Sequence, residues 1–67
     1  MNLALKIARI RADMTQAELA GKVGVTTKYI SCIETKGNKP SPKVMEKISN
    51  AVDASVQDLF FRKEGGD

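Results

Sequence analysis

Two short helical segments follow each other within residues 15–34, with a turn of only about three residues between them. Thr15 and Glu18 form a T-x-x-E pattern, in which the hydroxyl and the carboxylate bind N–H groups that a helix start leaves free. Gly24 favours the left-handed conformation that ends a helix, so the first segment should stop just before it. Thr26 is placed to cap the second segment. Two short helices with so little chain between them have to meet at a corner.

Helix signals continue on both sides of this corner, whereas strand signals are almost absent. Residues 3–12 contain neither Gly nor Pro, and Ser41 followed by Pro42 is a strong helix start. Ser55 opens an S-x-x-D pattern, and the polar residues 35–40, with Gly and Pro, should form a loop. The sequence therefore predicts an all-α protein with five short helices, over residues 3–12, 16–23, 27–34, 42–53 and 56–60.

The chain is short for a folded domain, at 67 residues. We expect a single domain over residues 1–67, with residues 62–67 as a polar tail. Only two Phe, one Tyr and no Trp are present to fill a core. A core of this size gives marginal stability, which favours pairing with a second copy. We also expect a stand-alone unit without a sensor domain.

Apolar side chains fall on two sides of the predicted helix over residues 3–12. At about 100° per residue, one face carries Leu5, Ala8 and Ala12, and the other carries Leu3, Ile7 and Ile10. The second face needs a cover other than the main core. A second copy of the chain can supply it, or residues 1–3 and 60–62 can pair as a short terminal β-ribbon over Ile10. The sequence leaves both alternatives open.

The residue types exclude several classes of function. The chain has no His, so it lacks imidazole metal ligands and His-based nucleophile triads, and its one cysteine, Cys32, cannot form an internal disulfide. We therefore expect no enzyme activity, no catalytic residues, no metal and no cofactor, and no small-molecule effector is evident. The chain has no leader pattern and no apolar run near membrane-spanning length, so we expect a soluble, cytoplasmic protein without membrane contact.

Positive charge is concentrated in one part of the chain. The formal net charge is +3, but residues 22–47 hold six lysines and two glutamates, a net +4. This stretch includes the second helix of the corner and the loop that follows it. A local excess of lysine of this kind favours a polyanionic partner.

The second helix of the corner has two distinct faces. Ile30 and Ile33 point to one side, and the other side carries the modest polar side chains of Thr27, Lys28, Ser31 and Cys32. A single helix fits the major groove of B-DNA, where such side chains meet base edges. The sequence therefore favours a DNA-reading helix at this position.

These residues resemble the helix-turn-helix of the Cro and phage-repressor-like family, also called the XRE-like family. The matching fragments, in the family's order, are L-K-x-A-R from Leu5, T-Q-x-E-L-A from Thr15, V-G-V-T from Val23, I-x-x-I-E from Ile30, N-x-P-S from Asn38 and S-V-x-D-L-F from Ser55. The resemblance covers most of the chain. It implies a lambda-repressor-like fold and a transcriptional regulator, more specifically a repressor, that binds an inverted repeat of double-stranded DNA as a homodimer.

The resemblance also implies roles for particular residues. Base-reading positions of the family match Thr27, Lys28 and Cys32, with Ser31 between them. Phosphate contacts are implied for Gln16, Thr26, Lys36, Asn38 and Lys39. For Tyr29 two interpretations stay open, packing at the core edge or a hydroxyl contact to phosphate. Arg9 and Glu34 match a family pair that ties the first helix to the end of the third, so we interpret both as structural.

The sequence departs from the family at a few positions. Asp13 and Asp53 stand where the family commonly has Gly, so two turns have to place a non-Gly residue in the left-handed region. A thiol at Cys32 is a poor base reader and weakens the expectation of strong sequence specificity. Phe61 and the second apolar face of the first helix need cover, and small members of the family join through the C-terminal helix and chain ends. We therefore expect dimer contacts at Leu3, Ile7, Val56 and Phe61. The alternative function is a protein-interaction module, such as an antitoxin, that binds DNA only secondarily.

Overall fold

The computed structural model describes residues 1–61, and the predicted polar tail, residues 62–67, lies outside the described residues. The described chain forms five α-helices and no strand: α1 (Leu3–Arg11), α2 (Gln16–Val23), α3 (Thr27–Lys36), α4 (Pro42–Val52) and α5 (Val56–Phe60). The predicted all-α class and the order of the helices are confirmed. Up to Phe61, none of these helices has the length and apolar character needed to cross a membrane.

Polar side chains start the helices at the positions that the sequence indicates. The Thr15 hydroxyl accepts a hydrogen bond from the Glu18 N–H (3.1 Å), and the Glu18 carboxylate accepts one from the Thr15 N–H (2.8 Å). The capping box at α2 is therefore complete. The starts of α3, α4 and α5 have the hydroxyl half of this arrangement, in which Thr26, Ser41 and Ser55 each accept from the N–H three residues on. Local hydrogen bonds thus fix where the helices begin.

The end of α3 differs from the prediction. The helix continues through Thr35 to Lys36, two residues that the sequence assigned to a loop. It ends at Gly37, whose φ of 72° is left-handed, just as Gly24 with φ 87° ends α2. Polar residues do not stop a helix by themselves, whereas a glycine that adopts the left-handed conformation does. The prediction of a loop from residue 35 was therefore wrong by half a turn.

The N-terminal residues contact α3 and form no strand. Leu3 already begins α1 and Phe60 is the last residue of α5, so residues 1–61 hold no terminal β-ribbon. The Asn2 N–H donates to the Glu34 carbonyl (2.8 Å), and the Asn2 side chain caps α1 by accepting from the Leu5 N–H (3.0 Å). The Asn2 N–H is therefore bonded to α3 instead of a second strand, and Leu3 and Phe60 are helical, which is why the ribbon alternative was wrong for the part of it that is described.

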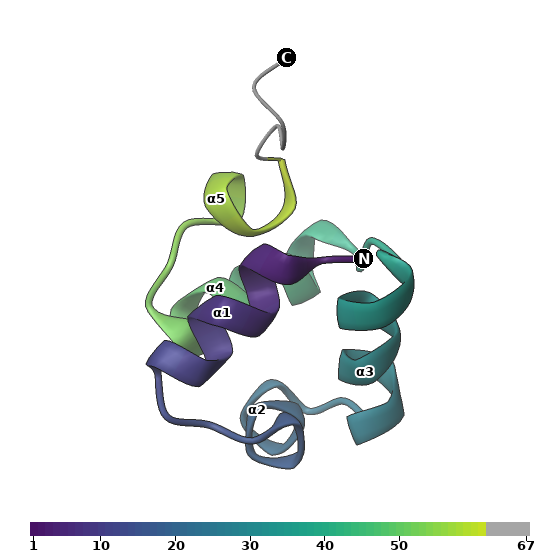
Figure 1. Ribbon diagram of the computed structural model, residues 1–67, viewed down its shortest axis with the longest axis vertical. Helices are drawn as coiled ribbons and strands as arrows, with labels where there is room; N and C mark the ends of the chain where they lie inside the picture. Colours follow the sequence, from purple (N-terminus) through teal and green to yellow (C-terminus); the bar gives the residue numbers. More distant parts are fainter. Residues whose placement is uncertain (62–67) are drawn as a thin grey trace.

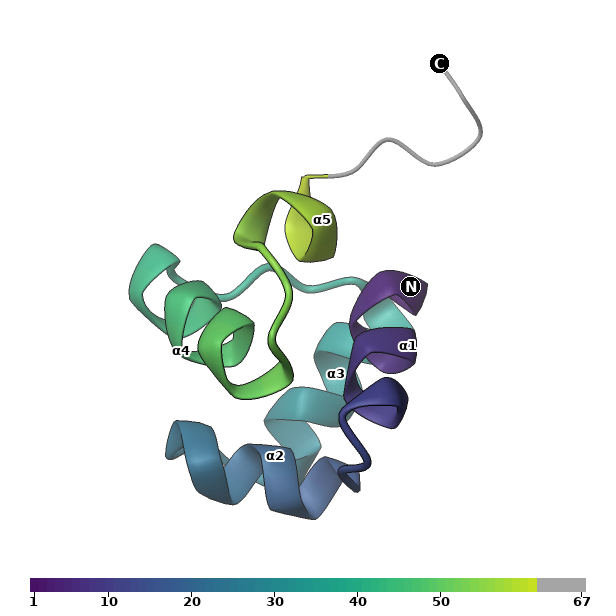
Figure 2. The same cartoon turned by 90° about the vertical axis from the view of Figure 1, so that its left-hand side faces the viewer.

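The helices pack around one core, and Figures 1 and 2 show how they are arranged. The α2–α3 corner lies at one end, α4 packs across α2, and α5 closes the other end against α1 and α4. The side chains that are almost fully enclosed are Leu5, Leu19, Ile30, Ile33 and Ile48. They come from α1 to α4, so the predicted corner is held by the same core as the rest of the molecule.

The second apolar face of α1 is exposed, as its sequence indicates. Leu3, Ile7 and Ile10 keep 47%, 43% and 58% of their surface accessible. The opposite face of α1 is buried through Leu5 and packs against the core through Ala8 and Ala12. The exposed face therefore has no cover within residues 1–61.

Candidate nucleic-acid interface

α3 is held by one face and presents the other to solvent. Ile30, Ile33 and Glu34 are buried on the inner side. On the outer side Thr27 and Lys28 are exposed, whereas Ser31 and Cys32 are half-buried. Packing of the inner face against α2 fixes the helix, so the four predicted base-reading residues lie along an accessible surface.

A hollow of about 360 Å³ lies between α3 and the loop that follows it. This α3 hollow is lined by Thr26, Lys28, Tyr29, Cys32, Ile33, Asn38, Lys39 and Pro40. Six of these residues were predicted DNA contacts, and they come from two separate segments of the chain. Thr27, Ser31 and Lys36 belong to α3 but do not line the hollow. Pro40, which is buried, was not among the predicted contacts, although the N-x-P-S fragment contains it.

The chemistry of the α3 hollow suits an anionic, hydrogen-bonding partner. Lys28 and Lys39 bring two positive charges, and no acidic residue is among the lining residues. The Tyr29 hydroxyl and the Asn38 amide add hydrogen-bond donors. Tyr29 keeps 37% of its surface exposed, so it lies at the rim and not in the core. Phosphate oxygens and base edges are the groups that such donors bind in protein–DNA complexes.

Cys32 contributes a half-buried, free thiol to the hollow. A thiol is only a weak hydrogen-bond donor and acceptor, so it offers a small, nearly apolar surface there. In the part of the chain that the structure describes, no three Cys, Asp or Glu side chains gather as a metal ion would require.

Gln16 lies apart from the hollow, at the first position of α2. Its side-chain Nε2 donates to Glu34 Oε1 over 3.1 Å. The N–H groups in the first turn of a helix have no partner inside the helix, and they attract anions. Gln16 therefore lies where a phosphate contact is feasible, and its bond to Glu34 was not predicted from the sequence.

Arg9 and Glu34 form a buried ion pair that joins α1 to α3. Arg9 Nε lies 2.7 Å from Glu34 Oε2, and Arg9 Nη2 donates to Glu34 Oε1 over 3.2 Å. Arg9 Nη1 also donates to the Met14 carbonyl (2.8 Å) in the loop before α2. Only 9% of Arg9 and 4% of Glu34 is exposed. Both residues thus have the structural position that the sequence resemblance implies.

Lys39 connects the α3 hollow to the end of the described chain. Its ammonium lies 4.8 Å from the centre of the Phe61 ring, a cation–π contact. Phe61 is 48% exposed. A predicted phosphate contact and a predicted dimer contact are therefore neighbours, which the sequence did not indicate.

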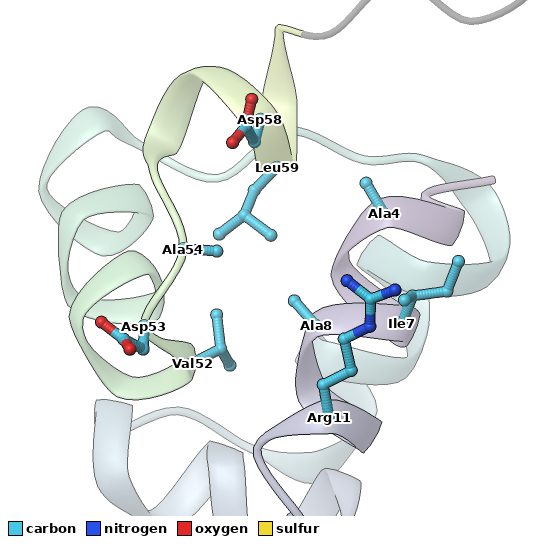
Figure 3. A pocket seen from close by; sticks show the side chains of 9 residues that line it. All are labelled: Ala4, Ile7, Ala8, Arg11, Val52, Asp53, Ala54, Asp58 and Leu59. Atoms are coloured by element: carbon cyan, nitrogen blue, oxygen red, sulfur yellow. The ribbon is translucent and has the colours of Figure 1, made fainter.

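A larger groove, of about 740 Å³, lies between α1 and the segment from the end of α4 to α5 (Figure 3). We call it the α1 groove; it is lined by Ala4, Ile7, Ala8, Arg11, Val52, Asp53, Ala54, Asp58 and Leu59. Arg11 lies on the α1 side, and Asp53 and Asp58 lie on the opposite side. Of the four predicted dimer residues, only Ile7 lines this groove, whereas Val56 packs against the core and Leu3 lines a smaller neighbouring hollow. The groove has no signal in the sequence, because its two walls come from opposite ends of the chain.

Known proteins are similar to this chain in sequence, and two of them also in fold. The helix-turn-helix family model matches residues 5–59. An HTH-type transcriptional regulator of Archaeoglobus fulgidus is 36% identical over 64 residues, which span 96% of this chain and 90% of that protein. The N-terminal DNA-binding domain of SinR from Bacillus subtilis is 34% identical, with a TM-score of 0.78 over 91% of this chain and 88% of that one. The clp gene regulator ClgR from C. glutamicum is 29% identical, with a TM-score of 0.73 over 87% of this chain and 75% of that one.

Proposed function

We propose that this chain, which belongs to the helix-turn-helix family, is a transcriptional regulator that binds double-stranded DNA in a sequence-specific way. In this proposal it acts as a repressor, in the cytoplasm, and binds an inverted-repeat operator as a homodimer. Residues 1–67 serve as one DNA-binding domain without catalytic activity or effector. α3 enters the major groove of each half-site.

The observation that carries the proposal is the outer surface of α3 together with the α3 hollow. Base contacts are assigned to Thr27, Lys28, Ser31 and Cys32, which follow one exposed side of α3. Phosphate contacts are assigned to Gln16, Thr26, Tyr29, Lys36, Asn38 and Lys39, which flank that side or precede it. Phosphate contacts on both sides of a recognition helix set its register, and the base contacts then read sequence. The names of the relatives, which are transcriptional regulators and DNA-binding domains, support the same role.

Lys28 carries the sharpest test of base reading. Its ammonium can donate to the O6 and N7 atoms of guanine, so Lys28→Ala should cost about 1–3 kcal/mol, or roughly 5- to 150-fold in affinity, on the preferred operator. The preference at one base pair should relax at the same time. Binding curves on operator variants measure both effects. Lys6→Ala removes the same charge from an exposed position of α1 and should change affinity little. An equal loss on every DNA sequence would instead make Lys28 a phosphate contact.

The operator itself is obtained by selecting bound sequences from a random DNA pool. An inverted repeat with half-sites about one helical turn apart is the expected outcome. A salt series on the selected DNA checks the charge contribution, because each neutralised phosphate releases counterions and steepens the fall of affinity with salt. A salt slope near zero would contradict the proposed DNA contact.

The α1 groove favours a second candidate function, a protein-interaction module. The exposed apolar face of α1 borders the groove, and charged side chains stand on both of its sides. Ile7→Glu places a charge in the groove at an exposed position, whereas Ile10→Glu places the same charge on α1 outside it. If Ile7→Glu alone stops regulation of a reporter gene while DNA binding in vitro is unchanged, the groove serves a protein partner. If both variants regulate the reporter gene as wild type does, regulation needs DNA binding alone.

A further inference from the structure

Glu34 accepts hydrogen bonds from three separate segments of the chain. Its Oε1 receives Arg9 Nη2 from α1 and Gln16 Nε2 from α2, and its backbone carbonyl receives the Asn2 N–H. Glu34 itself lies near the end of α3 and is only 4% exposed. The carboxylate therefore fixes the first residue of α2 relative to the helix that is proposed to read bases.

The bond also fixes the orientation of the Gln16 side chain. An ionised carboxylate only accepts hydrogen bonds, so the amide nitrogen of Gln16, and not its oxygen, has to face Glu34. The Nε2 group has a second hydrogen that this bond does not use. The backbone N–H groups of Gln16 and Ala17, in the first turn of α2, are likewise free of partners in the helix.

The charge of Glu34 does not oppose an anion at this place. Arg9 forms two hydrogen bonds to the carboxylate, at 2.7 and 3.2 Å, so the buried pair is neutral overall. A phosphate that approaches the start of α2 therefore meets an oriented amide and free N–H groups. Without Arg9, the same carboxylate would repel that phosphate.

We propose that Glu34 is a positioning residue for DNA binding, which holds the Gln16 amide ready for a backbone phosphate. The inference rests on the proposed function, because it needs a DNA phosphate at the start of α2. It assigns Glu34 a role beyond stability. The phosphate contact of α2 and the base contacts of α3 are then tied together by one buried carboxylate.

The test is a double-mutant cycle on operator binding. Gln16→Ala should lower affinity by about 10-fold on every DNA sequence, which corresponds to about 1.4 kcal/mol. The salt slope should stay unchanged, because a neutral amide releases no counterion. Replacing the ion pair by apolar side chains, in Arg9→Met with Glu34→Leu, should keep the fold, since such replacements of buried pairs are often tolerated. That variant should show the same uniform loss, and adding Gln16→Ala to it should cost nothing further.

Controls separate positioning from stability and from the proposed function. Thermal unfolding of each variant checks that the protein used for binding is folded, and Gln57→Ala, an exposed glutamine of α5, should leave binding unchanged. In amide NMR spectra, the Gln16 side-chain hydrogens should lose their protection from exchange when Glu34 is replaced. If the folded apolar variant binds DNA like wild type, or if Gln16→Ala still costs the full 10-fold in it, the positioning role is wrong. If wild type itself shows no preference for any DNA sequence, the proposed function is wrong instead.

Discussion

Removal of Arg9 should strongly affect folding. Its guanidinium joins α1 to Glu34 and to the Met14 carbonyl, and the pair is buried. Arg9→Ala would leave the Glu34 carboxylate buried without its cation, a change that costs about 3–5 kcal/mol. A chain of 67 residues has a total stability of roughly 3–10 kcal/mol. The loss removes the whole stability at the low end of this range and leaves at most about 7 kcal/mol at the high end, so urea unfolding should show a midpoint far below that of wild type.

Arg11→Ala is the matched control for that prediction. Arg11 belongs to the same helix, carries the same charge and is exposed. Surface substitutions of this kind usually change stability by less than about 0.5 kcal/mol. If the two alanine variants unfolded at the same urea concentration, the Arg9–Glu34 pair would contribute no more than an ordinary surface charge.

Individual residues show what local sequence can and cannot predict. The Arg9–Glu34 pair was predictable because a known family pattern contains both positions. The Gln16–Glu34 bond was not, because it joins the first residue of one helix to the last turns of another and depends on how the helices cross. The contact between Lys39 and Phe61 was missed for the same reason. Side-chain partners far apart in the sequence appear only once the helices are placed.

At the scale of the helix, one glycine inside α2 and one that caps its end have opposite roles. Gly21 lies inside the helix with open space around its missing Cβ, so Gly21→Ala should stabilise the protein by about 0.5–1 kcal/mol. Gly24 ends the helix with φ 87° and also has open space, so Gly24→Ala meets only backbone strain. That strain should cost about 1–2 kcal/mol. Thermal or urea unfolding of the two variants measures the increase in stability expected for one and the decrease expected for the other. An increase in stability in both variants would mean that Gly24 does not need its left-handed conformation.

Some features of the helices were predictable from the sequence, and others were not. Their starts were predicted correctly at α2, α3, α4 and α5, because a cap acts over three residues. Both expected left-handed turns occur, at Asp13 with φ 60° and Asp53 with φ 55°. The end of α3 was misplaced because Gly37, and not the polar residues before it, ends the helix. The conformation of the N-terminal residues was left open, because it depends on the hydrogen bond from Asn2 to the distant Glu34 carbonyl.

For the whole molecule, residues 1–61 present one helix-turn-helix, which in the proposed function reads one segment of major groove. The lysine-rich stretch was visible in the sequence, but the α3 hollow was not, because it forms only where the loop after α3 folds back beside that helix. Residues 22–47 carry the net +4, and Lys28 and Lys39 of this stretch line the hollow. The proposed homodimer supplies a second reading helix with the same surface. The two half-sites then have to face the dimer from the same side of the DNA.

This requirement predicts a strict dependence on half-site spacing. Successive major grooves on one side of B-DNA are about 34 Å apart, or about 10 base pairs. Insertion of five base pairs between the half-sites turns one of them to the opposite side, so affinity should fall to that of a single half-site. Titrations of the chain on duplexes with the selected spacing, with five added base pairs and with one half-site alone measure this loss. Sedimentation of the protein–DNA complex gives the number of copies bound. Equal affinity on the first two duplexes would show that each copy binds by itself, because independent copies have no fixed geometry to satisfy.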